Sequence, residues 1–236
     1  MNYHRRIALK IYFLIQRKAY SQMSKQEYSE LIEKGDVLER DHRGVKVVEV
    51  SNGKIFKIFK IFRLKRLFSS AYFFPYALRF KKNASELKKR GIETVEVDNI
   101  LYCEEEQRHV LSYKKVIGMP IRSILEIEKD NKTLLKKFIR YVSLLHSKGI
   151  YFRSLHFGNV IVKPNGDFVL IDISDMLFFN KKLTINHRVR NWHHVIKNKF
   201  EREIIDYYGW DGFINEYASC SELGERDTRK LKLRKT

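Results

Sequence analysis

The stretch YFRSLHFGNVIVKPNGDFVLID, residues 151–172, decides the fold. Two short apolar runs are separated by the turn residues PNGD, a pattern that predicts a small β-hairpin. Asn159 precedes the first run and Asp172 follows the second, with Ser154 and His156 just upstream. We therefore expect the hairpin to bring an amide and a carboxylate together at one end.

The segment before this hairpin has the periodicity of an amphipathic helix. Over residues 131–147 basic side chains fill one face, and Lys148-Gly149 ends the pattern. The opposite face carries the apolar residues Leu134, Leu135, Phe138, Val142 and Leu145. The chain after the hairpin is predicted to be helical and irregular.

The first half of the chain is predicted to be mainly strands. Residues 21–34 resemble a helix with a capping box at Ser24 and Glu27. After it, and again after a basic, aromatic stretch that becomes helical near its end, come short strand-like runs. The strand-like runs are 36–41, 44–50, 53–62, 94–103 and 108–116, and the basic, aromatic stretch is 63–91. Asn52-Gly53 is a strong hairpin turn.

The two halves predict an α+β fold in two lobes that join near Ile117-Gly118. We expect an antiparallel-sheet lobe with one main helix, followed by a mostly helical lobe. The predicted boundaries are a basic N-terminal helical segment (1–36), a first lobe (37–117), a second lobe (118–223) and a frayed basic tail (224–236).

Composition points to a folded, strongly basic protein. The 236 residues are 44% hydrophobic and 13% aromatic, which excludes global disorder. The formal net charge of +19 favours anionic partners such as nucleic acid, anionic lipid headgroups, phosphorylated glycans or nucleotides. Charge alone does not choose among them.

The sequence favours a reducing compartment. Cys103 and Cys220 have no neighbouring cysteine or histidine in a metal-ligand pattern. Residues 1–20 briefly mimic a signal peptide, but Lys10 interrupts the apolar run. No window approaches the roughly 18 apolar residues of a spanning helix. We expect a cytoplasmic protein, with peripheral contact to the cytoplasmic face of an inner membrane left open.

The segments HSKGIYFRSLHFGNVIV and FVLID resemble the catalytic core of the protein-kinase-like fold. They are most similar to the small bacterial kinases that phosphorylate inner-core sugars of lipopolysaccharide, including the relatives called toluene-tolerance proteins. The resemblance extends from about Val37 to about Ala218. It implies a bilobal fold that binds ATP with Mg²⁺ or Mn²⁺ between its lobes.

The resemblance assigns roles to particular residues. Asn159 and Asp172, 13 positions apart, match the two metal-holding residues of such kinases. Lys57 matches the strand lysine that contacts the nucleotide phosphates. Glu86 is the carboxylate able to pair with Lys57, and Asn83 is an alternative partner.

Several positions depart from the family pattern. Ser154 stands where the catalytic aspartate is expected, and Phe152 stands where a histidine is expected. Asp172 is not followed by the usual Phe-Gly. Serine cannot act as a base at neutral pH, so Asp175 and His156 are candidate substitutes, although each is also explained as an ordinary loop residue.

Other basic positions have two interpretations each. Strand alternation places Lys57 on one sheet face and Lys60 on the other, and either is also explained as a solvated edge residue. The stretch 60–82 either contacts an anionic membrane or packs on the sheet. Three basic residues of one helix either line an acceptor groove or form ordinary surface charge; they are Arg188, Arg190 and His193.

The resemblance predicts an ATP-dependent kinase whose acceptor is a sugar hydroxyl of an anionic glycolipid, the lipopolysaccharide core. In this hypothesis Ser154 orients the acceptor hydroxyl and Asp172 holds the metal. The first alternative is a nucleotide-binding pseudokinase that lacks the catalytic carboxylate. The second is a basic RNA-binding protein, disfavoured because its charges are spread along the chain and no nucleic-acid-binding module is recognisable.

Overall fold

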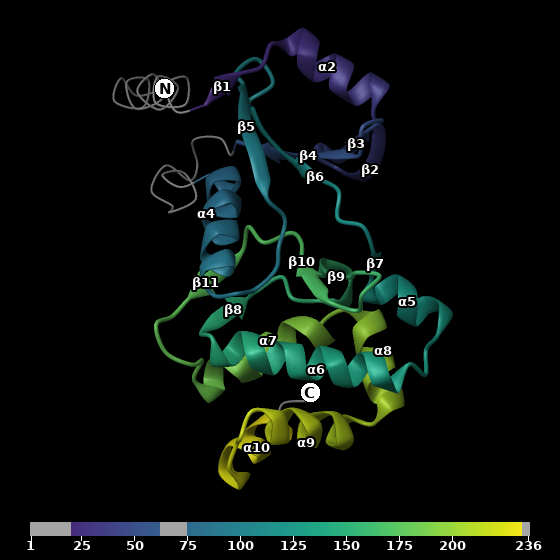
Figure 1. Ribbon diagram of the computed structural model, residues 1–236, viewed down its shortest axis with the longest axis vertical. Coiled ribbons are helices and arrows are strands. Elements are labelled where there is room, and N and C mark those ends of the chain that lie inside the picture. Colours follow the sequence, from purple (N-terminus) through teal and green to yellow (C-terminus); the bar gives the residue numbers. More distant parts are fainter. Residues whose placement is uncertain (1–19, 62–74, 233–236) are drawn as a thin grey trace. The chain divides into compact units, whose positions relative to one another are not determined.

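A computed structural model describes residues 20–61 and 75–232 of the chain (Figure 1). The chain divides into a sheet unit, Met1–Ala84 with Val95–Lys115, and a helical unit, Ser85–Thr94 with Val116–Thr236. The division after Lys115 falls close to the expected join, but the segment 85–94 belongs to the helical unit rather than to the first lobe.

The sheet unit contains one six-stranded sheet in the order β1-β5-β6-β4-β3-β2. All neighbouring strands are antiparallel except β1 and β5, which are parallel. The elements of this unit are β1 (Ser21–Gln22), α2 (Lys25–Lys34), β2 (Asp36–Asp41), β3 (Gly44–Val50), β4 (Lys54–Lys60), β5 (Val97–Cys103), β6 (Arg108–Lys114) and the first part of α4 (Tyr76–Lys89).

One face of the sheet is covered by α2. Ser24 and Glu27 form the predicted capping box, in which the Glu27 amide donates to the Ser24 hydroxyl at 3.2 Å. Met23 and Tyr28 pack against buried residues of the sheet, namely Val45, Val48, Ile58, Cys103 and Val110. The expected helix over 21–34 is wrong at its start, because residues 21–22 extend the sheet as β1. Residues 20–36 therefore belong to the sheet unit, and residues 1–19 lie outside the described residues.

The first part of α4 packs on the other face. The Phe80 ring lies 6.4 Å from Phe59 and 5.8 Å from Tyr113. Lys57 shares the Phe59 face, as strand alternation predicts, and its ammonium lies 6.0 Å from that ring. Of the basic, aromatic stretch, residues 62–74 lie outside the described residues, and helix starts at Tyr76.

The helical unit surrounds two small sheets, with strand orders β10-β9-β7 and β11-β8. It also contains the end of α4. Its other elements are β7 (Met119–Pro120), α5 (Ile121–Ile127), α6 (Lys132–Ser147), β8 (Ile150–Phe152), η2 (Phe157–Asn159), β9 (Val160–Val162), β10 (Phe168–Leu170), β11 (Met176–Phe178), α7 (Ile185–Ile196), α8 (Lys199–Tyr208), α9 (Trp210–Cys220) and α10 (Glu225–Lys232).

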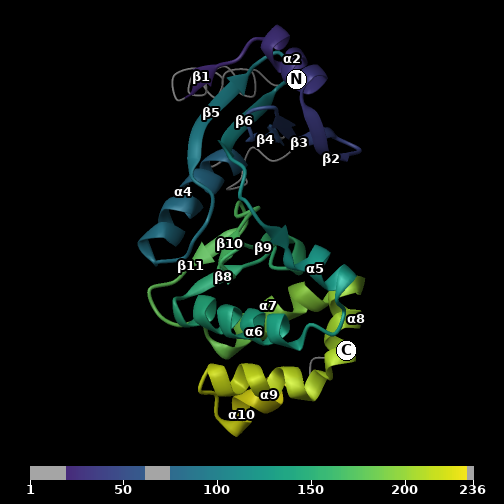
Figure 2. The ribbon, with the colours of Figure 1, turned by 45° about the vertical axis from the view of Figure 1, so that its right-hand side comes forward.

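The core of this unit centres on Trp192. Its ring packs edge-on against Phe138, Phe213 and Tyr217, so α6, α7 and α9 meet at one point (Figure 2). The predicted apolar stripe of α6 is buried here, and Asn131 caps the helix by accepting the Leu134 amide at 2.9 Å. The helix predicted over 131–147 is confirmed.

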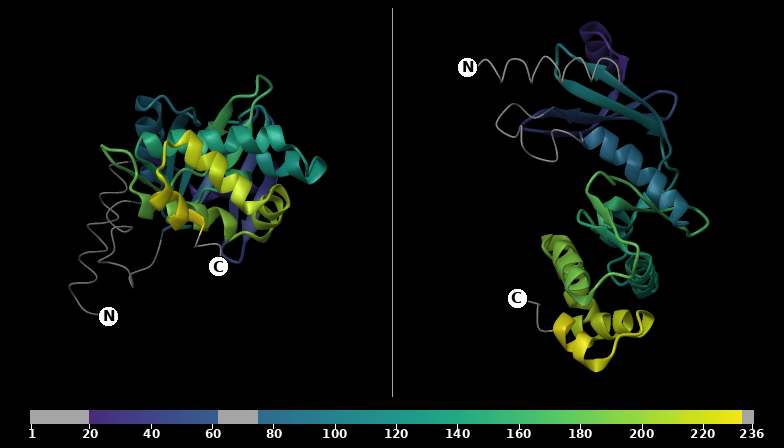
Figure 3. Two further views of the ribbon diagram at one scale, coloured as in Figure 1. Left: turned by 90° about the horizontal axis from the view of Figure 1, so that it is seen from below. Right: turned by 90° about the vertical axis from the view of Figure 1, so that its left-hand side faces the viewer.

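The expected frayed tail is largely an ordered helix. Residues 225–232 form α10, which packs against α9 (Figure 3). Leu231 is only 2% exposed. Acidic residues begin α10 and basic residues end it, which complements the helix dipole. Among the helices described, none is both long and apolar enough to cross a bilayer.

A buried polar network connects the helices to β8. Burial lowers the pKa of His146 to about 3, so the ring is neutral at pH 7. Its Nδ1 accepts from the Tyr217 hydroxyl at 2.6 Å, and its Nε2 donates to Asn191 Oδ1 at 3.0 Å. The Asn191 amide then donates to the Phe152 carbonyl at 2.6 Å. Each partner is satisfied, so the network stabilises one arrangement of the core.

Arg188 belongs to the same network. Its guanidinium donates to the Tyr217 hydroxyl at 3.2 Å, and the residue is 4% exposed. Both interpretations of Arg188 from the sequence, a groove-lining residue and surface charge, are therefore wrong. The reason is that α7 turns this position toward α9.

Two glycines of the helical unit offer a matched test of backbone strain. Gly149 has φ +71°, and a Cβ there would overlap the carbonyl oxygens of Phe179 and Lys181. Gly91 has φ +67° with no atom within 4 Å of a Cβ. We predict that Gly91→Ala costs about 1–2 kcal/mol from strain alone, and that Gly149→Ala costs roughly 1–3 kcal/mol more.

The measurement is urea unfolding followed by tryptophan fluorescence. Both tryptophans of the chain, Trp192 and Trp210, lie in the helical unit, so the signal reports on that unit. Equal losses in the two variants would contradict the packing assigned to Gly149.

Candidate functional site

The hairpin predicted from residues 151–172 is present. β9 and β10 are antiparallel, with Val160 opposite Leu170. The Ile171 amide donates to the Asn159 carbonyl at 3.0 Å. Asn159 directly precedes β9 and Asp172 follows β10, so the two residues lie at the same end of the hairpin.

The side chain of Asn159 is held in one orientation. It is 6% exposed, and its Nδ2 donates to the carbonyl oxygen of Ser154 at 2.8 Å. Within the part of the chain that the structure describes, no donor reaches its Oδ1. The bond to Ser154 therefore leaves the amide oxygen as a hard ligand atom of fixed position.

Asp172 has an unusual backbone. Its φ is +51°, a left-handed conformation that non-glycine residues seldom adopt. Only Gln107 and Glu222 share it among the described non-glycine residues. Aspartate tolerates this conformation better than most residues, and such strain often marks functional positions. Asp172 is half-buried, and its own constrained backbone carries the carboxylate.

The two candidate substitutes for a catalytic base are both engaged. Asp175 accepts hydrogen bonds from the Arg153 guanidinium, one of them from Nε at 2.9 Å. His156 Nδ1 accepts the Gly158 amide at 3.1 Å, which caps η2. Burial lowers the pKa of His156, although Glu201 opposes the shift. These contacts support the ordinary structural interpretation of both residues.

Glu201 was missed by the sequence analysis. It is fully buried, and its Oε1 accepts the Phe157 amide at 3.1 Å and the Arg122 guanidinium at 2.6 Å. A carboxylate on α8 thereby holds the turn that leads to Asn159. The sequence offers one signal for the burial of Glu201. It lies three and four residues before Ile204 and Ile205, so it shares the apolar face of α8, and all three are buried.

Lys57 and Glu86 lie in different units. Lys57 is half-buried on β4 of the sheet unit. Glu86 lies on the part of α4 that belongs to the helical unit, and its Oε1 accepts from Lys89 Nζ at 3.0 Å. Asn83, the alternative partner, is 6% exposed on the same helix. The pairing of Lys57 with either residue stays a prediction.

The residues present suit a magnesium or manganese ion held mainly by nucleotide phosphates. Among residues 20–61 and 75–232, no group of three or more His, Cys, Asp or Glu side chains is placed to hold a metal. Mg²⁺ needs only one or two protein oxygens when phosphates and water complete its shell. The Asn159 amide oxygen and the Asp172 carboxylate fit that requirement.

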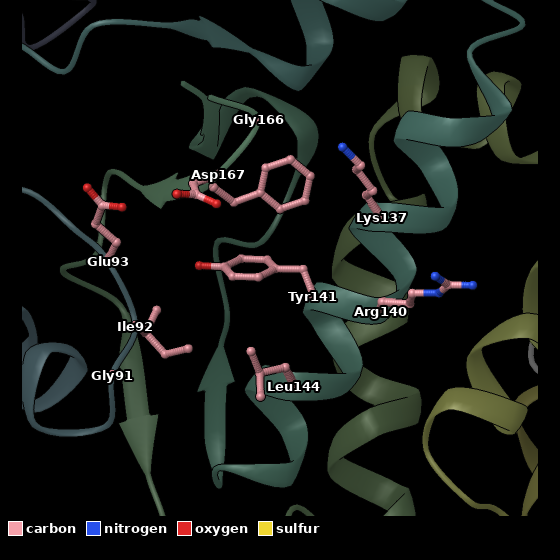
Figure 4. A pocket seen from close by; sticks show the side chains of 10 residues that line it. Gly91, Ile92, Glu93, Lys137, Arg140, Tyr141, Leu144, Gly166 and Asp167 are labelled. Carbon is pink, nitrogen blue, oxygen red and sulfur yellow. The ribbon is translucent and has the colours of Figure 1, made fainter. Parts of the chain in front are cut away.

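A separate pocket of about 430 Å³ lies at the turn end of the hairpin (Figure 4). Phe168 and Tyr141 meet edge-on at 5.1 Å on one side of it, and Lys137 and Arg140 extend from α6. Because Gly166 and Phe168 line it, this pocket is at the opposite end of the hairpin from Asn159. None of the candidate residues lines it.

The element order confirms the predicted α+β fold, with a mostly antiparallel sheet, one main helix between β4 and β5, and a mostly helical second unit. No protein-family model matches the sequence. No similar sequence is found among curated proteins. Among solved structures, a crystal structure of monomeric WbdD matches with a TM-score of 0.49 and 15% identity, over 80% of this chain and 44% of that chain. This chain thus spans less than half of that protein.

We predict that the Glu201–Arg122 pair stabilises the helical unit. Glu201→Gln leaves Arg122 without its carboxylate and should lower the free energy of unfolding by about 2–3 kcal/mol. Arg122→Gln should also destabilise, and the double variant should lose less than the sum, with a coupling of about 0.5–3 kcal/mol.

Tryptophan fluorescence in urea again gives the measurement. Glu203→Gln is the matched control, because Glu203 lies on the same helix with an exposed partner, Lys199, at 3.7 Å. It should change stability by less than about 0.5 kcal/mol. Strict additivity of Glu201→Gln and Arg122→Gln would remove the proposed coupling.

Proposed function

We propose that this protein binds ATP with Mg²⁺ or Mn²⁺ and transfers the γ-phosphate to a sugar hydroxyl of the lipopolysaccharide inner core. The observation that carries the proposal is the hydrogen bond from Asn159 to the Ser154 carbonyl, at 2.8 Å, beside the left-handed Asp172. It supports a prearranged amide and carboxylate at the position where such kinases hold their metal.

In phosphoryl transfer the protein mainly positions the nucleotide and the acceptor and neutralises the charge of the phosphates. Asn159 and Asp172 would hold the divalent ion, which neutralises phosphate charge when bound. Lys57 would contact the phosphates, with Glu86 or Asn83 as its partner. Ser154 would orient the acceptor hydroxyl through its own hydroxyl.

The acceptor class follows from the resemblance and from charge. An inner-core glycolipid carries phosphates and sugar acids, and the net charge of +19 favours such a substrate. Lipid-linked acceptors would bring the protein to the cytoplasmic face of the inner membrane as a peripheral protein.

A nucleotide-binding pseudokinase is the second candidate function. It is favoured by Ser154 at the base position and by the engagement of Asp175 and His156 in other contacts. However, general-base catalysis contributes only about 10²–10⁴-fold, so its loss slows transfer without abolishing it. In a loose transition state the hydroxyl proton leaves late.

We predict that ATP with Mg²⁺ stabilises the wild-type protein against heat, by about 2.7 kcal/mol at 100 times its dissociation constant. Asp172→Asn should abolish most of this effect because one ligand charge is lost. Asp167→Asn is the control, since Asp167 lies on the exposed turn of the same hairpin. Equal ATP shifts in both variants would refute the assignment of Asp172.

The RNA-binding alternative predicts a different ligand and no role for Asp172. It expects RNA affinity that falls steeply with salt and is unchanged by Asp172→Asn.

Mass spectrometry of the lipopolysaccharide core from cells with wild-type or Asp172→Asn protein tests the acceptor. An unchanged phosphate count would exclude the proposed substrate.

We predict that Ser154→Ala lowers turnover about threefold to tenfold, the worth of one neutral hydrogen bond, and leaves the ATP shift unchanged. The rate of phosphate transfer from radiolabelled ATP to purified core oligosaccharide gives the measurement. Stabilisation by ATP without any transfer by the wild-type protein would favour the pseudokinase.

A further inference from the structure

Charged and aromatic side chains gather beside Ser154. Arg153 follows β8 directly, and its amide donates to the Asp175 carbonyl at 3.1 Å. β11, which begins one residue after Asp175, pairs with β8. Two chain segments that flank the candidate site are therefore joined here.

Helix α7 packs on these segments through Tyr151. This residue is 2% exposed, and its hydroxyl lies 3.3 Å from His194 Nε2. The Tyr151 ring is also 5.5 Å from the His187 ring. Because β8 and α7 are held together here, the position of the α7 side chains relative to Arg153 is fixed.

The cluster has an excess of positive charge. Arg153, Arg190 and Asp175 all act electrostatically on the Tyr151 hydroxyl and on His194. Lys197 acts on His194 as well. Burial lowers the pKa of His194, and Arg153 lowers it further, so the ring is neutral at pH 7. Arg190 lies three residues after His187 and four before His194, so it is on the side of α7 that packs on Tyr151.

Arg190 is a cation available for a ligand, as is the exposed Lys197 at the end of α7. Asp175 already holds Arg153 through hydrogen bonds. Arg190 is exposed, and across the described ranges no carboxylate forms an ion pair with it. A guanidinium binds phosphate and carboxylate groups through two parallel hydrogen bonds, which gives geometric selectivity.

We propose that Arg190, with Arg153 and His194, forms a subsite for an oxyanion of the acceptor, a phosphate or carboxylate on a sugar near the reacting hydroxyl. This inference rests on the proposed function, because Arg153 adjoins Ser154 and an acceptor held here would reach it. The subsite would select anionic over neutral sugars. The net positive charge favours anionic partners without saying where they bind, and the subsite gives that binding one location.

The test uses deacylated lipopolysaccharide core oligosaccharide, fluorescently labelled, with binding measured by anisotropy at fixed salt. Arg190→Gln should weaken binding roughly 10- to 100-fold, the loss of a charge-assisted pair of hydrogen bonds. Arg190→Lys should lie between, because it keeps the charge without the planar fork.

Arg226→Gln is the matched control. Arg226 is an exposed arginine of α10 in the same unit, and it is not among the charges that act on Tyr151 or His194. The control should bind within about twofold of the wild type, a difference below roughly 0.5 kcal/mol. Unchanged tryptophan fluorescence in all variants would exclude unfolding as the cause of a loss.

Dephosphorylated core, which keeps its carboxylates, identifies the bound group. A loss with Arg190→Gln for the phosphorylated core alone indicates phosphate, and a loss for both indicates carboxylate. Equal binding by Arg190→Gln and Arg226→Gln, or no binding by the wild type, would overturn the subsite. Arg190-dependent binding without phosphate transfer would support the subsite and contradict the kinase activity. Phosphate transfer with an acceptor KM that is unchanged in Arg190→Gln would support the kinase activity and contradict the subsite.

Discussion

The hydrogen bond from the Asn159 side chain to the Ser154 carbonyl, at 2.8 Å, is the interaction on which the candidate site depends. It closes the loop that carries Ser154 and His156 and sets the direction of the amide oxygen. A second bond, from the Phe157 amide to the buried Glu201 carboxylate, holds the same loop from α8. Because the Asn159 donor and the Glu201 acceptor both belong to buried side chains, breaking either bond leaves a buried polar group unsatisfied. The loop therefore has one stable conformation.

The support for this loop reaches deep into the helical unit. The Phe152 carbonyl at the end of β8 accepts from Asn191, which is linked through His146 to Tyr217. Helices α6, α7 and α9 thus hold the chain just before the loop, as α8 holds its middle. A site whose supporting residues are themselves fixed loses little free energy in ordering when a ligand binds. The large aromatic core around Trp192 contributes to the candidate site in this indirect way.

Chemistry at this site would rely on charge placement more than on proton transfer. Ser154 offers no carboxylate, and the nearby Asp175 is engaged by Arg153. Backbone strain is present at Asp172, which follows β10 and has a φ of +51°. On α7, the exposed Arg190 acts electrostatically on the Tyr151 hydroxyl, on the strand that precedes the loop. In the proposed arrangement, the metal-holding oxygens and the anion-binding cations would lie on two sides of Ser154. Such an arrangement suits a reaction whose rate depends on the orientation of its substrates.

The sequence by itself determined the elements whose signals are local. The PNGD turn between two apolar runs determined the hairpin, and hence that Asn159 and Asp172 lie at the same end of it. The helical periodicities of α2 and α6 were also predicted correctly, because turns and amphipathic faces depend on neighbours a few positions away. Only the tertiary structure decided the contacts between distant segments. These include the parallel pairing of β1 with β5, the burial of Arg188 against α9, and the bond between Arg122 and Glu201. The reason is that a charged residue is predicted to be exposed unless its distant partner is known, and the sequence does not show that partner.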